Sequence, residues 1–302
     1  MRIYLFAKIE YMYGNYNQYG NWELGGFGKI LAIIALCLAG GMPAYGAPQS
    51  AKIISPDIQI SGELGERLEV ERVIDGDSLV LDGGLRVSLA GIQTPKMAWP
   101  EKGYEAWPLA VEAKTYLRSL VKGKTLQLYY NGDQRDRYGR AIAQVWIAST
   151  NQWLQEEMVR AGYARVYSQS GHSMDTRRLY KAEERARAKK LGIWDDANTN
   201  NYYAVRRPDP NPLAQYVDSV QIVEGIVISA ANVRGTIYLN FGSDYKTDFT
   251  VAISKKNARK FAKQGFDPLA LEGAKIRVRG YIEITNGPII WLSDLWRLEV
   301  LD

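Results

Sequence analysis

The sequence predicts a mixed α+β fold, mainly β with helices, arranged as two small β-barrels, the first with helices packed against it. The length of 302 residues fits two domains, because single domains typically hold about 100–200 residues. Short runs rich in β-branched and apolar residues are separated by turn residues, which is typical of consecutive antiparallel strands. Helical patterns follow the strands instead of alternating with them, which favours a barrel over a parallel sheet.

The composition indicates a folded, weakly basic chain. Hydrophobic residues make up 46% and charged residues 24%, which excludes wholesale disorder, a collagen-like chain and a coiled coil. The net charge of +5 permits a polyanionic partner without requiring one. The single cysteine, Cys37, excludes an intramolecular disulfide, and the single histidine, His172, excludes a mechanism built on a histidine pair. We expect His172 to be a solvated side chain in a loop.

Residues 1–46 have the features of an extension that ends in a secretory signal. A lysine precedes an apolar run at 30–41, and small residues follow. The run is shorter than the about 20 residues that span a bilayer, which favours a signal cleaved after Gly46. We therefore expect export to the periplasm or the extracellular space, with a membrane anchor at residues 30–46 as the alternative. Residues 47–65 are a short lead-in.

The first domain begins with three predicted strands, at residues 68–74, 79–81 and 85–90. The turns Asp-Gly-Asp at 75–77 and Asp-Gly-Gly at 82–84 separate them, which predicts antiparallel pairing.

Helices and two further strands complete this domain. Apolar residues at helical spacing predict a helix over 106–120 with Pro108 in its first turn. Strands are predicted at 125–130 and 141–147, and helices at 151–161 and 176–190, ended by Gly162 and Gly192. Acidic and basic residues alternate on the last helix, which is typical of a solvated face.

A stretch rich in proline and asparagine at 197–215 predicts a semi-rigid linker, and residues 216–302 form the second domain. Its predicted strands are 220–228, 236–241, 248–253, 275–285, 288–292 and 297–301. A helix over 255–264, capped by Ser254, follows the third strand, and Asn286-Gly287 predicts a hairpin turn. This order predicts a second, smaller barrel.

Basic residues gather on two elements of the second domain. They are Lys256, Arg259, Lys260 and Lys263 on the helix, and Arg277 and Arg279 on one face of a strand. Such rows can track a phosphate backbone, and the alternative is an ordinary solvated surface.

Five segments of the first domain occur in the order and spacing of a known family. They are Val-Ile-Asp-Gly-Asp-Ser at 73–78, Ala-Gly-Ile-Gln-Thr-Pro-Lys at 90–96, Asp-Arg-Tyr-Gly-Arg at 136–140, Val-Arg-Ala-Gly-Tyr-Ala-Arg-Val at 159–166 and Lys-Lys-Leu-Gly-Ile-Trp at 189–194. Together they closely resemble the staphylococcal-nuclease-like (thermonuclease) family over residues 66–196. The resemblance implies an OB-type barrel with helices, and the second domain has an OB-like order as well.

The resemblance also implies a site. In that family a calcium ion is held by the second aspartate of the first segment and by the aspartate of an Asp-Thr-Pro-Glu segment. The glutamate of that segment assists the attacking water, and two arginines grip the phosphate. Asp77 stands at the first ligand position, with Asp75 nearby. Thr94 matches the threonine that lends its carbonyl, and Arg140 matches the second arginine.

Three positions depart from the family pattern. Gln93 replaces the second carboxylate ligand, Lys96 replaces the glutamate, and Ser88 replaces the first arginine. Arg86 is a candidate substitute, because residues two apart on a strand share a face. Loss of a transition-state donor costs about 10²–10³ in rate, and loss of general acid–base assistance costs about 10²–10⁴. We therefore expect the catalytic site to be degenerate.

The remaining charges do not favour a divalent cation. Asp75, Asp77, Lys96 and Arg140 sum to zero, whereas calcium needs several carboxylates in close array. We expect no cofactor, and calcium only if the domain is an active enzyme.

Basic and aromatic residues around the site suit a single-stranded nucleic acid or another polyanion. They are Lys96, Arg137, Arg140 and Arg86, with Tyr138 and Tyr167 as stacking faces. The alternative is that the Tyr-Gly-Arg turn is structural and Lys96 is a solvated loop lysine.

Three functions remain as hypotheses. The first is an exported protein that binds nucleic acid, or another anionic partner, without efficient cleavage. The second is an active metal-dependent phosphodiesterase with an altered site, using Asp77, Thr94, Arg140 and Arg86. The third is a structural or protein-interaction module of the cell envelope. A membrane is expected as a partner only through an uncleaved signal.

Overall fold

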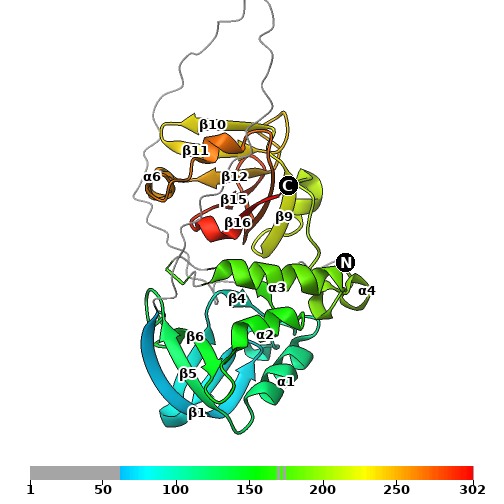
Figure 1. Cartoon of the computed structure of the whole chain (residues 1–302). Helices are drawn as coiled ribbons and strands as arrows, with labels where there is room; N and C mark the ends of the chain where they lie inside the picture. Colours follow the sequence, from blue (N-terminus) through cyan, green and yellow to red (C-terminus); the bar gives the residue numbers. More distant parts are fainter. Residues whose placement is uncertain (1–61, 169–170, 173–174, 302) are drawn as a thin grey trace, which may run out of the picture. The chain divides into compact units, whose positions relative to one another are not determined.

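Five strands of the first domain close a β-barrel. They are β1 (Glu63–Asp75), β2 (Ser78–Leu81), β3 (Leu85–Leu89), β5 (Thr125–Tyr130) and β6 (Ala141–Ile147) (Figure 1). The strand order is β3-β2-β1-β5-β6, and a parallel pairing of β3 with β6 closes the circuit. The other neighbours in the circuit are antiparallel. The turns at 75–77 and 82–84 predict this for β1 with β2 and for β2 with β3. The barrel implied by the resemblance is therefore present.

The computed structural model describes residues 62–168, 171–172 and 175–301. These residues belong to one compact unit of the chain. The predicted extension, signal and cleavage point, together with nearly all of the lead-in, lie outside the described residues. Within the described ranges, no helix combines the length and the apolar character needed to cross a membrane.

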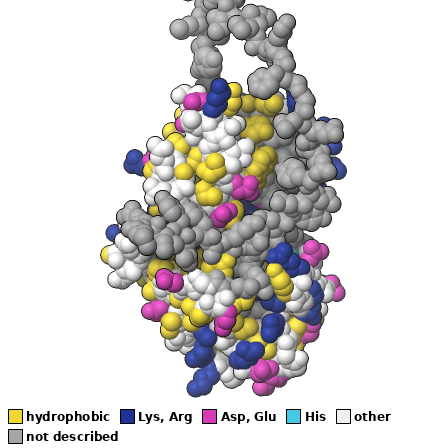
Figure 2. All heavy atoms as spheres, turned by 180° about the vertical axis from the view of Figure 1, so that it is seen from behind, with side chains coloured by type: hydrophobic (Ala, Val, Ile, Leu, Met, Phe, Trp, Pro, Cys, Tyr) yellow, Lys and Arg dark blue, Asp and Glu magenta, His cyan; other side chains and the backbone are white. Residues whose placement is uncertain are grey.

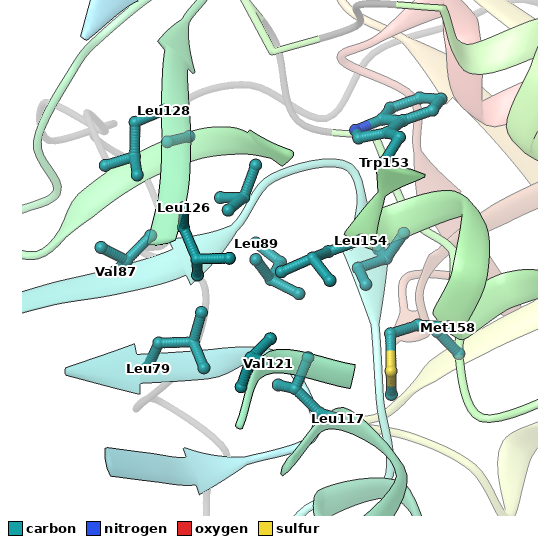
Figure 3. Packing of buried hydrophobic residues seen from close by; sticks show 14 of the residues in the cluster. Leu79, Val87, Leu89, Leu117, Val121, Leu126, Leu128, Trp153, Leu154 and Met158 are labelled. Atoms are coloured by element: carbon teal, nitrogen blue, oxygen red, sulfur yellow. The ribbon is translucent and has the colours of Figure 1, made fainter. Parts of the chain in front are cut away.

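Strand alternation fills the barrel with aliphatic side chains. Leu79 of β2 and Leu126 of β5 are fully buried, as period-two alternation requires for residues that face inward (Figure 3). Leu117, Leu154 and Met158 come from two helices and lie in the same core. The helices are therefore part of the barrel's packing.

Three helices accompany this barrel: α1 (Ala110–Val121), α2 (Leu154–Arg160) and α3 (Thr176–Ala188). α1 begins four residues later than predicted, because Leu109 has a φ of 66° and cannot continue a right-handed helix. α2 also begins late, because β7 (Gln152–Trp153) pairs with the end of β6.

A short two-stranded sheet brings two distant segments together. β4 (Ile92–Gln93) pairs antiparallel with β8 (Arg165–Val166). This pairing holds the segment at 90–96 against the segment at 159–166, so two of the five family segments meet in space.

The second domain has eight strands in two sheets around one core. They are β9 (Val220–Ile226), β10 (Ser229–Val233), β11 (Thr236–Asn240), β12 (Thr250–Ile253), β13 (Lys275–Tyr281), β14 (Glu283–Ile284), β15 (Pro288–Trp291) and β16 (Leu298–Leu301). The sheet orders are β10-β11-β12-β15-β14 and β16-β13-β9. The predicted strand 275–285 is interrupted, and its parts β13 and β14 lie in different sheets. The predicted strand 220–228 ends at Ile226, and β10 is a strand that the sequence analysis did not predict. The expected second barrel is therefore described as two sheets. β12 and β15 pair in parallel, as β3 and β6 do.

The helix of this domain and the predicted linker have local caps. α6 (Lys255–Lys263) begins after Ser254, whose hydroxyl accepts a hydrogen bond from the Asn257 backbone N–H, as predicted. The linker contains two short helices, α4 (Asp196–Thr199) and α5 (Pro210–Ala214). The Asp195 carboxylate, just before the linker, caps α4. A proline begins α5, so a residue type that predicts irregular structure starts a helix here.

Candidate functional site

The turn between β1 and β2 places a buried carboxylate beside the segment at 93–96. The Asp77 backbone N–H donates to Asp75 Oδ1 over 3.1 Å, and Asp77 Oδ2 accepts from the Thr94 backbone N–H over 3.1 Å. A Cβ at Gly76 would lie 2.9 Å from the Thr94 side chain, so the close approach requires glycine. Asp77 is 4% exposed and Thr94 is 1% exposed.

Lys96 reaches into this turn and pairs with Asp77. Its Nζ lies 2.7 Å from Asp77 Oδ1 and 2.5 Å from Asp77 Oδ2, and it is 4.0 Å from Asp75 Oδ2. The lysine is only 7% exposed. It is therefore not a solvated loop lysine, and that expectation is wrong. Its ammonium is the internal counter-ion of a buried carboxylate.

Burial and pairing shift the pKa values of Asp75 and Asp77 in opposite directions. Burial works to raise the pKa of Asp77, but the charge of Lys96 and its hydrogen bonds hold that pKa below its usual range. Burial and the neighbouring Asp77 charge raise the pKa of Asp75 to about 6, although Lys96 opposes the shift. The two aspartates therefore shift in opposite directions from their usual pKa.

Gln93 turns to a buried arginine. Its Oε1 accepts a hydrogen bond from Arg165 Nε over 2.7 Å, and Arg165 Nη2 donates to the Val220 carbonyl of β9 over 3.0 Å. Arg165 is 4% exposed, and burial lowers its pKa. Sequence reasoning did not single out Arg165, although it lies in the segment at 159–166. The amide at position 93 therefore links the site to the second domain.

The donor set does not match what calcium requires. Calcium takes six to eight oxygen ligands, with carboxylates among them. Here Lys96 holds both oxygens of Asp77, and Gln93 is bonded to Arg165. No group of three metal-binding His, Cys, Asp or Glu side chains occurs in the part of the chain that the structure describes. The Thr94 hydroxyl is buried and has no hydrogen-bond partner among these residues, but a single hydroxyl does not make a cation site.

Arg86 of β3 and Arg140, which directly precedes β6, lie at the same level of the barrel. Val87 of β3 pairs in parallel with Ala141 of β6, and Arg86 and Arg140 are the residues just before this pair. Arg86 is exposed and Ser88 is half-buried, whereas Val87 between them faces the core. The register therefore puts Arg86 near Arg140, as the substitution hypothesis needs.

The Asp-Arg-Tyr-Gly-Arg turn is held by its first residue. Asp136 Oδ1 accepts from the backbone N–H groups of Tyr138 and Arg140, and Asp136 Oδ2 accepts from Arg140 Nε over 2.7 Å. The Arg137 guanidinium lies 4.8 Å from the centre of the Tyr138 ring. Tyr138 is 45% exposed. The turn is structural, and it also presents a basic and aromatic surface.

Two side chains expected at the surface are buried. Tyr167 is 3% exposed, and the Arg297 guanidinium covers its ring at 4.2 Å. It cannot offer the predicted stacking face. His172 is 4% exposed, and burial lowers its pKa, so it is not a solvated loop residue. Residues of the second domain, remote in sequence, contribute to covering this region.

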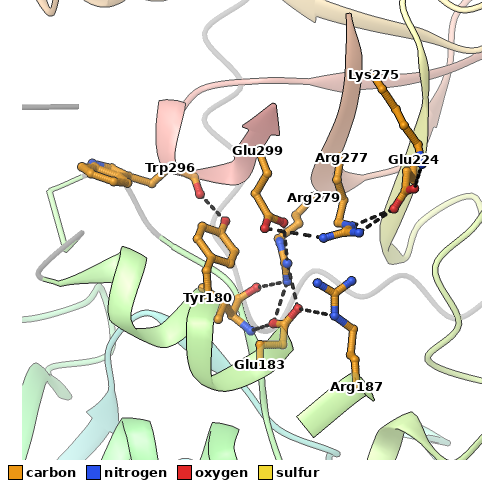
Figure 4. Close-up of polar contacts among 10 residues, drawn as sticks. Tyr180, Glu183, Arg187, Glu224, Lys275, Arg277, Arg279, Trp296 and Glu299 are labelled. Atoms are coloured by element: carbon orange, nitrogen blue, oxygen red, sulfur yellow. Dashed lines mark hydrogen bonds and ion pairs between the residues drawn. The ribbon is translucent and has the colours of Figure 1, made fainter. Parts of the chain in front are cut away.

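Arg277 and Arg279 do not form a nucleic-acid surface. Arg279 is 1% exposed, and its guanidinium donates to Glu183 of α3 and to Glu299, each over 2.8 Å (Figure 4). Arg277 pairs with Glu224 and Glu299. Glu183 is itself fully buried, so one face of α3 is not solvated as predicted. These arginines neutralise carboxylates that lie far from them in the sequence.

The basic residues of α6 are exposed. They are Lys255, Lys256, Arg259, Lys260 and Lys263. On the face of the molecule in Figure 2, by contrast, basic and acidic side chains are interspersed.

Comparison with known proteins identifies the first domain. The family model described as staphylococcal nuclease homologue matches residues 86–196. An uncharacterized endonuclease of Escherichia coli is 37% identical over 132 residues, covering 43% of this chain and 77% of the relative. The thermonuclease of Staphylococcus intermedius is 28% identical over 134 residues, covering 43% of this chain and 77% of the relative.

A fungal relative matches over less of its own length. The probable endonuclease LCL3 of Phaeosphaeria nodorum is 36% identical over 132 residues, covering 40% of this chain and 42% of the relative. All three matches have the length of one barrel domain, and the described fold of that domain is the one the family implies. Through its first domain, the chain belongs to the staphylococcal nuclease homologue family.

Proposed function

We propose that the nuclease-like domain binds single-stranded nucleic acid and has lost efficient calcium-dependent cleavage. The observation that carries the proposal is the Lys96 ammonium, which lies on both carboxylate oxygens of Asp77. A buried ammonium in that place supplies the positive charge that the family takes from calcium. It adds no oxygen ligand and no carboxylate to activate water.

The binding surface follows from basic and aromatic side chains around the Asp-Arg-Tyr-Gly-Arg turn. The exposed Arg86 and Arg137 and the half-buried Arg140 supply cations for phosphates, and the exposed ring of Tyr138 can stack on a base. Lys96 and Tyr167 do not belong to this surface because both are buried. Membership of a family whose relatives are named endonucleases supports nucleic acid as the ligand class.

Binding is tested with the full chain and a fluorescein-labelled single-stranded oligonucleotide in the presence of chelator. The variant Arg86→Gln/Arg137→Gln removes two phosphate contacts and lowers the dependence of log affinity on log salt by about 1.4, at about 0.7 per contact. The matched variant Arg118→Gln/Arg185→Gln removes two exposed arginines from α1 and α3 and leaves affinity unchanged. Binding that needs calcium, or equal losses in the two variants, contradicts the proposal.

Export is part of the same proposal and rests on the sequence of residues 29–47. Expression in a bacterial host with a functional secretion system should yield a mature chain whose amino terminus is Ala47. N-terminal sequencing of the purified protein checks this. A chain that keeps residues 30–46 and fractionates with membranes supports the anchor instead.

A further inference from the structure

Helix α6 concentrates positive charge without any acidic residue. Its nine residues, Lys255–Lys263, include five lysines and arginines, all of them exposed, and no aspartate or glutamate. At 1.5 Å per residue these charges are distributed over about 12 Å of helix. On α3, by contrast, Glu184 lies among the exposed basic residues. Helix α6 therefore contains no acidic residue of its own.

This arrangement is unfavourable for an isolated helix. Arg259 and Lys263 are four residues apart, and like charges at that spacing destabilise a helix. Lys255 and Lys256 lie in the first turn, where the positive end of the helix dipole opposes them. A bound polyanion relieves both effects, because phosphates are favoured at a helix N-terminus and between neighbouring cations.

The rest of the domain holds the helix rigidly. Phe261 is fully buried in the core of the second domain, and Asn257 Nδ2 donates to the Leu292 carbonyl over 3.4 Å. The Ser254 hydroxyl caps the first turn. A fixed helix presents its charges without the ordering entropy that a mobile tail loses on binding.

A neighbouring turn extends the basic surface. Arg234 is exposed at the turn between β10 and β11, and the next residue, Gly235, packs on Lys255. A Cβ at Gly235 would lie 2.9 Å from the Lys255 side chain. The turn therefore adjoins the start of α6 and adds a further cation to the same region.

We propose that α6 and the Arg234 turn form a second nucleic-acid contact, which binds the phosphate backbone without reading sequence. The proposal rests on the proposed nucleic-acid role of the chain and extends it to the second domain. Nucleic acid is favoured over an anionic membrane, because an interfacial helix needs an exposed face of large apolar residues. The large apolar residue of α6, Phe261, points into the core.

The experiment measures fluorescence anisotropy of a labelled thymidine homopolymer with the full chain, from low to physiological salt. The variant Lys256→Glu/Arg259→Glu/Lys263→Glu should bind at least about tenfold more weakly at low salt. The slope of log affinity against log salt should fall by about 2, at about 0.7 for each of three contacts. Thermal unfolding of each variant checks that the fold is retained.

A charge-matched variant separates local contact from overall charge. Lys181→Glu/Arg185→Glu/Lys189→Glu places the same charge change on exposed residues of α3 and on the residue that follows it. At physiological salt, where long-range effects are largely screened, its affinity should fall much less than that of the α6 variant. Equal losses in the two variants, or no loss in the α6 variant, overturn the inference.

Three further outcomes separate this inference from the proposed function and from membrane binding. If Arg86→Gln/Arg137→Gln weakens binding and the α6 variant does not, the inference fails and the proposed function stands. If the unchanged chain binds no oligonucleotide, both fail. If the α6 variant loses binding to phosphatidylserine vesicles but keeps oligonucleotide binding, the surface faces membranes and the inference is overturned.

Discussion

Lys96 Nζ lies 2.7 Å and 2.5 Å from the two carboxylate oxygens of Asp77, and both side chains are buried. In the family this aspartate ligates calcium and position 96 is a glutamate, as the resemblance implies. Here an ammonium lies on the ligand oxygens. Under the proposed function, the exchange of this one residue removes the catalytic carboxylate and blocks the metal ligand.

Lys96→Met should destabilise the chain by about 3–5 kcal/mol, because the variant leaves the Asp77 carboxylate buried and unpaired. Urea unfolding at pH 7 measures the change. The double variant Asp77→Asn/Lys96→Met removes both charges and should recover part of the loss. A loss below about 1 kcal/mol in the single variant would mean that the pair is not an internal ion pair.

Stability should depend on pH through Asp75. Its pKa is raised from 3.8 to about 6 in the folded chain, so between these values the folded state binds more protons than the unfolded state. The contribution of Asp75 to stability is therefore present below pH 3.8 and is lost as pH rises through 6. Asp75→Asn keeps an acceptor for the Asp77 N–H and should raise the melting temperature at pH 7 but not at pH 4. Equal shifts at the two pH values contradict the assignment.

Restoring the family residues should not suffice to restore calcium binding. In Ser88→Arg/Gln93→Asp/Lys96→Glu, the new carboxylate at position 93 faces the Arg165 guanidinium, which now donates to Gln93 over 2.7 Å. We expect it to pair with Arg165 at the expense of the cation. Adding Arg165→Gln should tighten calcium binding at least about tenfold, a change of 1.4 kcal/mol, as measured by titration calorimetry. Equal calcium affinities of the variants with and without Arg165→Gln would show that Arg165 does not compete with calcium for the carboxylate at position 93.

Arg279 should stabilise the nuclease-like domain from outside it. Arg279→Met leaves Glu183 buried with its main partner removed, which should cost about 3–5 kcal/mol. The matched control is Arg277→Met. Arg277 lies on the same strand but pairs with Glu224 and Glu299, not with Glu183, in the described structure, so its loss of stability should be smaller. Urea unfolding followed by tryptophan fluorescence compares them. Similar small losses in both variants would mean that Glu183 does not depend on Arg279.

The strands were largely predictable because their signals are local. The predicted runs at 125–130 and 141–147 match β5 and β6, since alternating or continuous apolar residues bounded by turns need no distant partner. The predicted start of α1 was wrong. Leu109 adopts a left-handed backbone conformation, and the sequence does not signal this because such positions usually hold glycine or asparagine.

The site was predictable only in its residue types. The family segments identify Asp77, Gln93 and Lys96, but spacing does not show that Lys96 turns inward to a carboxylate 19 residues away. The burial of Arg279 depends on Glu183, 96 residues away in the other domain. A row of arginines on a strand has the same sequence pattern whether nucleic acid or a buried glutamate neutralises it. Only the contacts between the two domains show that Arg279 pairs with Glu183.

The most direct test of the central claim is the cleavage of labelled single-stranded DNA by the full chain with calcium, with magnesium and with chelator. The account predicts that the oligonucleotide is bound and recovered intact under all three conditions, because Lys96 occupies the ligand oxygens of Asp77. Metal-dependent cleavage that Arg140→Ala abolishes would contradict it and would identify a working nuclease rebuilt around Arg86.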